Sequence, residues 1–428
     1  MLAGAVAAHG EFVDMFNGKD FTGWGGEGTT EVNGYVWKDG VMESTPKSRN
    51  LMTDQEYEDY ILEFEFQLTP GANNGLGIHY PGNGNPAYSG MELQILDGEH
   101  EKYKGKLKDY QHHGSIYTLA PALRGHMKPA GEWNSQRVTV RGPRVSVELN
   151  GVCIVDANLD ELNKKYPKHE GAKRRKGRIA FCGHGDVIRV RNMRVAELKF
   201  GADPEGAEYM PAGKRDPKLA DMGFTSLFDG KTLDGWVHGA GDIGHWVPKD
   251  GWILSYDGKS EAKDKNLWTE KEYRDFVLVC DWRWQGTGPR MQRPILLANG
   301  ETRIGGDKKP VTVEVVEYDS GIFLRGVADA QINMWNWPVG SGEVWGVRTK
   351  KHPLPIRAAV TPRVNADMPI GEWNRFVITV KGKAVTVVLN GKTVLFEAEL
   401  PPMKESGRIA LQHHGSEIDF ANLYIKEL

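Results

Sequence analysis

The sequence predicts an all-β protein built from two tandem jelly-roll sandwiches, and three observations support this fold class. Hydrophobic residues alternate with polar ones in "YILEFEFQL" at 60–68, as expected of a strand with one buried face. The stretches 145–155 and 385–395 each place Asn-Gly between two β-rich runs, which indicates a hairpin. Matched blocks also recur along the chain in the same order. Many antiparallel strands in domains of this length favour a two-sheet jelly roll.

The recurring blocks divide the chain into two copies of one domain. Residues 11–200 and 221–428 form the two predicted copies, and each is long enough to bury its own core. The segment 201–220, rich in Pro, Gly and charge, is the predicted linker. The matched blocks are "FVDMFNGKDFTGW" and "FTSLFDGKTLDGW", "NLMTDQEYEDYILEFEFQ" and "NLWTEKEYRDFVLVCDWR", "GEWN" twice, "VSVELNGVCIV" and "VTVVLNGKTVL", and "GRIAFCGHGDVIRVRNMRVAEL" and "GRIALQHHGSEIDFANLYIKEL".

The composition argues against several kinds of partner. A formal net charge of −3 over 428 residues gives no reason to expect nucleic acid or an anionic membrane. No stretch approaches the roughly 20 apolar residues that a membrane-spanning helix needs. The 52 glycines and 13 tryptophans suit a turn-rich β architecture, and flat aromatic rings also suit the binding of sugars.

The cysteines and the first residues bear on the compartment. Cys153, Cys182 and Cys280 do not make a disulfide framework, although the first two lie in one copy and could pair. The start, "MLAGAVAAHG", contains small residues of the kind found around a signal-peptidase cut. We therefore expect the tail of a trimmed export signal, and a periplasmic or secreted protein, in preference to an ordinary terminus.

Motifs spread over both copies resemble the 3-keto-disaccharide hydrolase domain family. They are "LFDGKTLDGW", "SGIFLR", "GMELQILD", "GSIY", "GEWN", "LNG" and the closing "GRIALQHHG" block. The resemblance implies a concanavalin A-like lectin/glucanase fold and an oligosaccharide or glycoside substrate that is oxidised at sugar C3. It also implies functional coupling to a sugar 3-dehydrogenase. The cleavage itself needs no redox cofactor, and the sequence contains no dinucleotide-binding Gly-rich turn.

The implied chemistry defines which groups a site must contain. A ketone at C3 acidifies the proton on C2, so a base can remove that proton while the C1–O bond breaks by β-elimination. Addition of water then completes a net hydrolysis. The route requires a base near C2, donors for the enolate oxygen and an acid for the leaving group.

Strand parity places candidate residues of the first copy on one polar, concave face. Glu92 and Gln94 point to the side opposite Leu93, because successive side chains of a strand alternate. The strand "GLGIHY" adds two glycines and His79 to this face, and glycines let a ligand approach the sheet closely.

The catalytic candidates are Glu92 as the base, Asp97 beyond the end of the same strand, and His184 in the closing block of the first copy. The substrate-binding candidates of this copy are His79, Gln94, His113, Tyr117 and Arg191. Several of these residues could instead have a structural role. Asp97 could cap a turn, and His113 and His184, each followed by a glycine, could stabilise a turn. Arg191 could form a structural ion pair. A divalent metal could in principle be bound by His79, Glu92, Asp97 and His113. The spacing of these residues matches no known metal motif, so no metal is assigned.

The second copy departs from this pattern. Gln331 is expected at the position of Gln94, with Asp329 at best in the place of Glu92. An insertion follows that contains Trp335, Trp337 and Trp345. We therefore expect the first copy to cleave substrate and the second mainly to hold it, with Trp335 stacking on sugar. The substrate-binding candidates of the second copy are Arg325, Gln331, Asn333 and Trp335.

Two other functions compete with cleavage of 3-keto-glycosides. A retaining β-glucanase shares the implied fold and needs two carboxylates about 5–5.5 Å apart. Glu92 and Asp97 imitate that arrangement, but the middle acidic residue of such enzymes is Gln94 here. A non-catalytic sugar-binding protein is favoured by the implied fold and by the tryptophan content.

Overall fold

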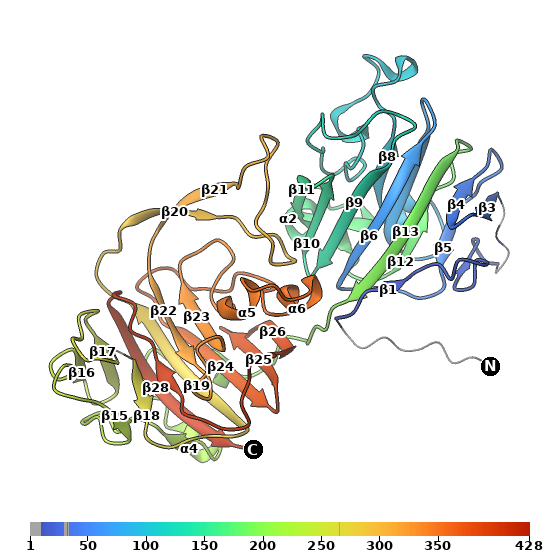
Figure 1. Cartoon of the computed structure of the whole chain (residues 1–428). Coiled ribbons are helices and arrows are strands. Elements are labelled where there is room, and N and C mark those ends of the chain that lie inside the picture. Colours follow the sequence, from blue (N-terminus) through green and yellow to red (C-terminus); the bar gives the residue numbers. More distant parts are fainter. Residues whose placement is uncertain (1–9, 30–31, 33, 265) are drawn as a thin grey trace. The chain divides into compact units, whose positions relative to one another are not determined.

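The computed structural model describes residues 10–29, 32, 34–264 and 266–428. The expected tail of an export signal falls almost entirely on residues 1–9, outside the described residues. The chain forms two compact units (Figure 1). The first holds the chain up to Leu198 together with Glu301–Val311, and the second holds Lys199–Gly300 and Thr312–Leu428. Within the first unit the amide of Cys153 donates to the carbonyl of Ile304 at 3.0 Å.

The first unit is a sandwich of two antiparallel sheets. The eight-stranded sheet has the order β11 (Val152–Asn158), β10 (Arg144–Leu149), β9 (Asn134–Arg141), β6 (Tyr60–Leu68), β13 (Ile188–Glu197), β4 (Val41–Ser44) and β3 (Tyr35–Lys38), with β1 (Val13–Asp14) beside β13. The five-stranded sheet has the order β2 (Trp24–Gly25), β5 (Leu51–Thr53), β12 (Arg178–Phe181), β7 (Asn73–Tyr80) and β8 (Met91–Leu96).

The second unit repeats this arrangement. Its eight-stranded sheet has the order β16 (Trp246–Lys249), β17 (Ile253–Tyr256), β28 (Ile418–Glu427), β19 (Phe276–Trp284), β24 (Asn374–Lys381), β25 (Ala384–Leu389) and β26 (Lys392–Glu399), with β14 (Thr225–Ser226) beside β28. Its five-stranded sheet has the order β15 (Trp236–Val237), β18 (Leu267–Thr269), β27 (Ala410–Leu411), β22 (Asp319–Phe323) and β23 (Gln331–Trp335). A separate pair joins β20 (Arg290–Pro294) to β21 (Thr312–Val316). The predicted all-β class, with two tandem sandwiches, is confirmed.

Each sandwich buries one face of both its sheets in a core of its own. In the first unit Leu62 and Phe66 of β6 share a core with Leu76 of β7 and Leu93 of β8, and none is more than 2% exposed. Burying a side chain of this size contributes roughly 1.5–3 kcal/mol. The alternation that predicted the strands therefore also fixes which residues remain on the outer faces of the sheets.

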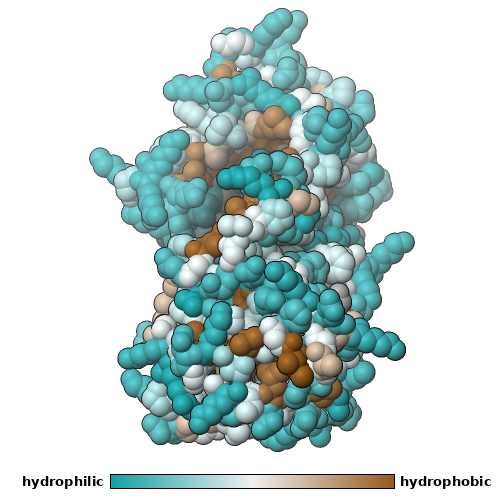
Figure 2. Space-filling model, turned by 90° about the vertical axis from the view of Figure 1, so that its left-hand side faces the viewer, coloured by the Kyte–Doolittle hydropathy of each residue, from teal (hydrophilic) through white to brown (hydrophobic). Residues whose placement is uncertain are grey.

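Helices are short and lie in the connections. They are α1 (Pro86–Ser89), α2 (Leu159–Lys165), α3 (Glu170–Lys173), α4 (Lys218–Asp221), α5 (Trp345–Arg348) and α6 (Leu354–Ala359), with 3-10 turns at Glu101–Tyr103, Asp109–Gln111 and Ala207–Tyr209. Within the described part of the chain, no helix has the length and apolar character needed to cross a membrane. Figure 2 shows one face of the molecule, on which hydrophilic side chains predominate and hydrophobic ones form small patches.

The cysteines are all buried and unpaired. Cys153 and Cys182, which could have formed a disulfide, are both free, and so is Cys280. Burial raises the pKa of the Cys153 thiol to about 12, and it raises those of the other two well above their usual range. These thiols are therefore protonated core residues at neutral pH and not nucleophiles.

Candidate active site

Glu92 and His184 meet on the outer face of the first unit's five-stranded sheet. Strand β8 presents Glu92 opposite Gly77 of β7, and the loop after β12 carries His184 to the same face. Nε2 of His184 lies 3.3 Å from Oε1 of Glu92. The Glu92 side chain is 7% exposed and that of His184 is 41% exposed. A nearly buried carboxylate is thus paired with an imidazole that solvent and ligands can reach.

Gly75 makes this pairing possible. It faces outward on β7 between the two partners, and a Cβ atom built there would lie only 1.9 Å from Oε1 of Glu92. The carboxylate therefore crosses directly over the backbone of β7, which only a glycine permits. The expectation that the glycines of "GLGIHY" allow close approach to the sheet holds here for a side chain of the protein itself.

The pairing changes the pKa of His184. The hydrogen bond to Glu92 raises the pKa of His184 above its usual value, while burial acts in the opposite direction. His184 therefore retains its proton to higher pH than an isolated imidazole. Burial, with a contribution from the Glu92 charge, keeps the nearby Cys182 thiol protonated by raising its pKa. The pair thus places a carboxyl group beside an imidazole of raised pKa, on a face that a ligand can reach.

Aromatic side chains border the pair. The amide of Tyr117 donates to the carbonyl of Glu92 at 2.8 Å, which places this substrate-binding candidate beside Glu92. The Tyr117 ring contacts Tyr110 at 5.6 Å and Tyr88 at 6.4 Å between centroids, and Tyr88 in turn contacts His169 at 6.0 Å. Burial and the neighbouring Tyr88 raise the pKa of Tyr117, so its hydroxyl remains a donor at neutral pH.

Sequence reasoning missed three members of this border. Tyr88 lies in α1, Tyr110 in the turn Asp109–Gln111, and His169 precedes α3, and no strand pattern or motif links these segments to β8. Tyr88 is 49% exposed, which is high for a tyrosine and suits the stacking of a ring on a sugar. The one signal in the sequence is the aromatic residue that follows the turn-forming Asn85-Pro86 pair.

Two candidates on or after β8 have structural contacts. Gln94 shares the face of Glu92, is 7% exposed, and its backbone amide donates to the carbonyl of Ser115 at 3.0 Å. Oδ2 of Asp97 accepts from the amide of Gly71 at 2.8 Å. Asp97 therefore has the turn-capping role that was its alternative, and its expected place among the catalytic residues is corrected.

The two remaining histidine candidates are buried away from the pair. His113 points between the sheets, where its ring stacks on Phe66 and its Nε2 lies 2.9 Å from Oε1 of Gln136. His79, one residue before the end of β7, has a left-handed conformation, with φ of 51°, and is 1% exposed. Burial lowers the pKa of each to about 4, so both are neutral. With Asp97, His113 lines a separate pocket of about 520 Å³ at one end of β8.

Arg191 belongs to the other sheet. It lies on β13, where its Nε donates to Glu65 at 2.7 Å and its guanidinium covers the ring of Trp133 at 4.0 Å. This is the structural ion pair that was its alternative. The structure does not bring Arg191 to Glu92.

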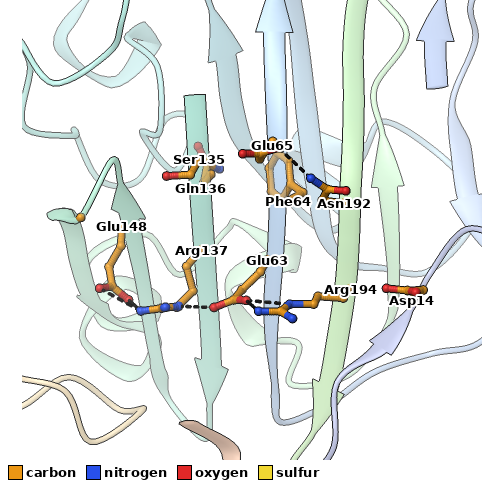
Figure 3. Close-up of a pocket in the computed structure, with 11 residues that line it drawn as sticks. Asp14, Glu63, Phe64, Glu65, Ser135, Gln136, Arg137, Glu148, Asn192 and Arg194 are labelled. Carbon is orange, nitrogen blue, oxygen red and sulfur yellow. Dashed lines mark hydrogen bonds and ion pairs between the residues drawn. The ribbon is translucent and has the colours of Figure 1, made fainter. Parts of the chain in front are cut away.

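A second pocket, of about 630 Å³, lies on the outer face of the eight-stranded sheet (Figure 3). A row of alternating charges crosses it from Glu148 through Arg137 and Glu63 to Arg194. The contacts of Glu63 measure 2.8 Å to Arg137 and 2.7 Å to Arg194. Because each carboxylate is engaged by an arginine, this row stabilises the sheet and offers no free base.

The second unit carries a carboxamide where the first carries its carboxylate. Strand pairing sets Gln331 opposite Phe323, as Glu92 is set opposite Gly77. Gln331 therefore occupies the position of Glu92 and not that of Gln94, which Asn333 takes, so the expected alignment was wrong by two residues. Its Nε2 donates to Oε1 of Gln412 at 2.5 Å. The insertion after this strand conceals the register in the sequence.

Trp335 does not offer a face to a sugar. It is 2% exposed, and its ring is stacked on that of Trp337 with centroids 4.1 Å apart and planes within 5°. Its Nε1 donates to the carbonyl of Gly340 at 2.7 Å. Trp335 is the last residue of β23, and the insertion that follows the strand folds back over it through Trp337 and Gly340. The expected stacking on sugar is corrected to packing against the insertion.

Other candidates of the second unit are also internal. Arg325 is 1% exposed and donates to the carbonyls of Gly382 and Lys404 and to Asp275. Asn333 is 3% exposed, and its backbone bonds to the segment at Gly342 and Glu343.

Two acidic residues of this unit are engaged by cations. Asp329 pairs with Lys350, and the buried Glu343 pairs with Arg348. Across the described residues of both units, no group of three or more His, Cys, Asp or Glu side chains is arranged to hold a metal ion.

Comparisons with known families and proteins agree with this architecture. The model of the 3-keto-alpha-glucoside-1,2-lyase-like domain matches residues 11–196 and again residues 223–426. The chain belongs to this family. A 3-keto-disaccharide hydrolase from Bacteroides thetaiotaomicron is 26% identical over an alignment of 227 positions, and the match covers 44% of this chain and 78% of that protein. Family membership and this relative indicate an enzyme of the glycosyl hydrolase type that acts on sugars.

Two solved structures from Parabacteroides distasonis, both of proteins assigned as glycosyl hydrolases, are also similar. One is 27% identical with a TM-score of 0.39, and the match covers 44% of this chain and 100% of that one. The other is 23% identical with a TM-score of 0.41, covering 44% of this chain and 95% of that one.

Proposed function

We propose that the first unit cleaves 3-keto-glycosides at the Glu92–His184 pair. The observation that carries the proposal is a carboxylate and an imidazole, 3.3 Å apart, on a sheet face bordered by tyrosines. The family assignment and the name of the Bacteroides relative support the substrate class. The proposal goes further than the family assignment, because it names a reaction and the residues of this chain that carry it out.

The pair and Tyr117 supply the groups that elimination needs. Glu92 takes the proton from C2, the C2–H electron pair forms the C1–C2 double bond, and the C1–O bond breaks with its electrons on the leaving oxygen. His184 gives that oxygen a proton, and the hydroxyl of Tyr117 donates to the enolate oxygen derived from the C3 ketone. Water then adds across the double bond, with its hydroxyl at C1 and a proton at C2.

The experiment that tests this proposal is the replacement Glu92→Gln, which preserves shape and removes the base. Removal of a general base costs about 10²–10⁴-fold in rate. We expect kcat on 3-keto-trehalose to fall within this range while KM changes by only a few-fold. Glu65→Gln is the matched control, because Glu65 pairs with Arg191 on the other sheet. An unchanged kcat in Glu92→Gln would remove Glu92 from the mechanism.

The retaining β-glucanase alternative finds less support. Its second carboxylate would have to face Glu92 across the glycosidic bond. Asp97, the candidate for that role, instead accepts from the amide of Gly71. A sugar-binding role without catalysis predicts binding of glycosides but no product, which the same assay distinguishes.

The supply of substrate is part of the proposal. A ketone at C3 has to be introduced by a reaction that oxidises the sugar hydroxyl, so we propose functional coupling to a sugar 3-dehydrogenase. Action in the periplasm or outside the cell stays a prediction from the first residues of the sequence.

A further inference from the structure

The outer faces of the two five-stranded sheets correspond residue by residue. The amide of Cys182 donates to the carbonyl of Gly75 at 2.8 Å, and the amide of Gln412 donates to that of Gly321 at the same distance. Two residues beyond these donors, both units place a histidine, His184 in the first and His414 in the second. A Cβ at either glycine would collide with the side chain that crosses it from the neighbouring strand. The two sites thus share one framework.

Within this framework a carboxylate and a carboxamide have exchanged places. The first unit has Glu92 on the edge strand and Asn73 two residues before the glycine. The second unit has Gln331 on the edge strand and Asp319 two residues before its glycine. At these two positions each unit therefore has one carboxylate, but on opposite sides of the glycine. Sequence reasoning did not single out Asp319, because the residue at the corresponding position of the first copy is the uncharged Asn73.

Asp319 is paired with the retained histidine. Oδ2 of Asp319 lies 3.6 Å from Nδ1 of His414, and the two side chains are 21% and 53% exposed. The other charged groups that face Asp319 are Glu317 and Arg293, which are bonded to each other at 2.6 Å. Burial raises the pKa of Asp319 to about 6, with His414 acting in the opposite direction. A carboxyl that titrates near neutral pH is suited to proton transfer.

The surroundings of Asp319 contain uncharged polar groups for a sugar. Gln331 and Gln412 form a pair of carboxamides that crosses Gly321, in place of the carboxylate and thiol of the first unit. On the same face, Phe323 stacks with Trp268 at 5.8 Å between centroids. Carboxamides that bind hydroxyls, beside aromatic rings, are common features of sugar sites.

We propose that Asp319 and His414 form a second acid–base pair, with which the second unit cleaves the same class of substrate as the first. The inference rests on the proposed function of Glu92. The step is balanced as before: Asp319 takes the C2 proton of a 3-keto-glycoside, the C1–C2 double bond forms, and the C1–O bond breaks. His414 protonates the leaving oxygen. The second unit is thus a second catalytic site and not only a holder of substrate.

The test measures three full-length proteins: the wild type, the variant Glu92→Gln, and the double variant that adds Asp319→Asn to it. Asparagine is tolerated in this framework, since Asn73 stands at the corresponding position of the first unit. We expect Glu92→Gln to retain measurable turnover of 3-keto-trehalose. Adding Asp319→Asn should lower this residual rate by at least about tenfold, a lower bound that is smaller than the factor typical for loss of a general base. The residual rate should also rise with pH between 5 and 7, as Asp319 loses its proton.

A matched control separates catalysis from a general effect of charge. Asp257 pairs with His245 in the same unit, after β17 of the other sheet, at 2.9 Å. Asp257→Asn added to Glu92→Gln should leave the residual rate unchanged. The inference is overturned if Glu92→Gln has no residual turnover, if Asp319→Asn does not lower it, or if Asp257→Asn lowers it equally. A wild-type chain that does not cleave 3-keto-trehalose overturns the proposed function and this inference together.

Discussion

Replacing Gly75 by alanine should disable the first unit without unfolding it. A Cβ at this position would lie 1.9 Å from Oε1 of Glu92 and 2.5 Å from its Cγ and Cδ, whereas such contacts are essentially never closer than 3.0 Å. The carboxylate must therefore move by at least the difference, 3.0 − 1.9 = 1.1 Å. A misplacement of about 1 Å in a catalytic group costs on the order of 10²-fold in rate. We expect kcat to fall by that factor.

The same substitution should also change the charge state of His184. Its pKa is raised by the hydrogen bond to Glu92, so displacement of the carboxylate should return the pKa toward the ordinary value of about 6.5. The assay is an NMR titration of the His184 ring together with turnover of 3-keto-trehalose and a thermal melt. The melt should change little, because the group that has to move is the end of a flexible side chain.

Gly77→Ala is the matched control for this experiment. Gly77 lies two residues along the same strand and faces the same side, but a Cβ there meets Ala180 at 3.4 Å and Pro86 at 3.5 Å, which are ordinary contacts. This variant should keep both the rate and the His184 titration. Wild-type activity in Gly75→Ala, or an equal loss in Gly77→Ala, would refute the argument that the bare backbone of Gly75 positions Glu92.

Two further predictions concern stability. Because the folded-state pKa of His184 is raised, its ion pair with Glu92 should stabilise the fold fully below about pH 6.5 and lose this effect as pH rises through the raised pKa. The melting temperature of His184→Gln should accordingly be below that of wild type at pH 5.5 and equal to it at pH 9; a difference independent of pH would contradict this assignment. Trp335→Ala should cost roughly 3–5 kcal/mol of unfolding free energy, as for a buried tryptophan, with KM unchanged. A raised KM with an unchanged free energy of unfolding would instead restore Trp335 as a sugar-stacking residue.

The fold could be predicted because its signals are local and repeated. The period of two in β6 and the Asn-Gly turns after β10 and β25 depend only on neighbouring residues. The duplication showed each sequence block twice, which supported the assignment of its strands and turns. The same local rule placed Glu92 on the outer face of β8, and the loop after β12 brings His184 to it.

What could not be predicted depends on contacts between distant segments. Parity gives the face on which Trp335 lies, but not that Trp337 folds over it. His113 lies in a loop, and its side chain points into the core beside Phe66. The alternation of a strand gives no information about the direction of a loop side chain. The register of Gln331 became visible only from its pairing with Phe323.

The most direct test of the central claim is cleavage of 3-keto-trehalose by the wild-type chain in heavy water. If Glu92 removes the C2 proton and water then adds across the double bond, the released 3-keto-glucose carries deuterium at C2, and unoxidised trehalose is left intact. A sample without protein corrects for spontaneous exchange at C2. Release of 3-keto-glucose with hydrogen retained at C2, or equal cleavage of trehalose, would contradict elimination at the Glu92–His184 pair.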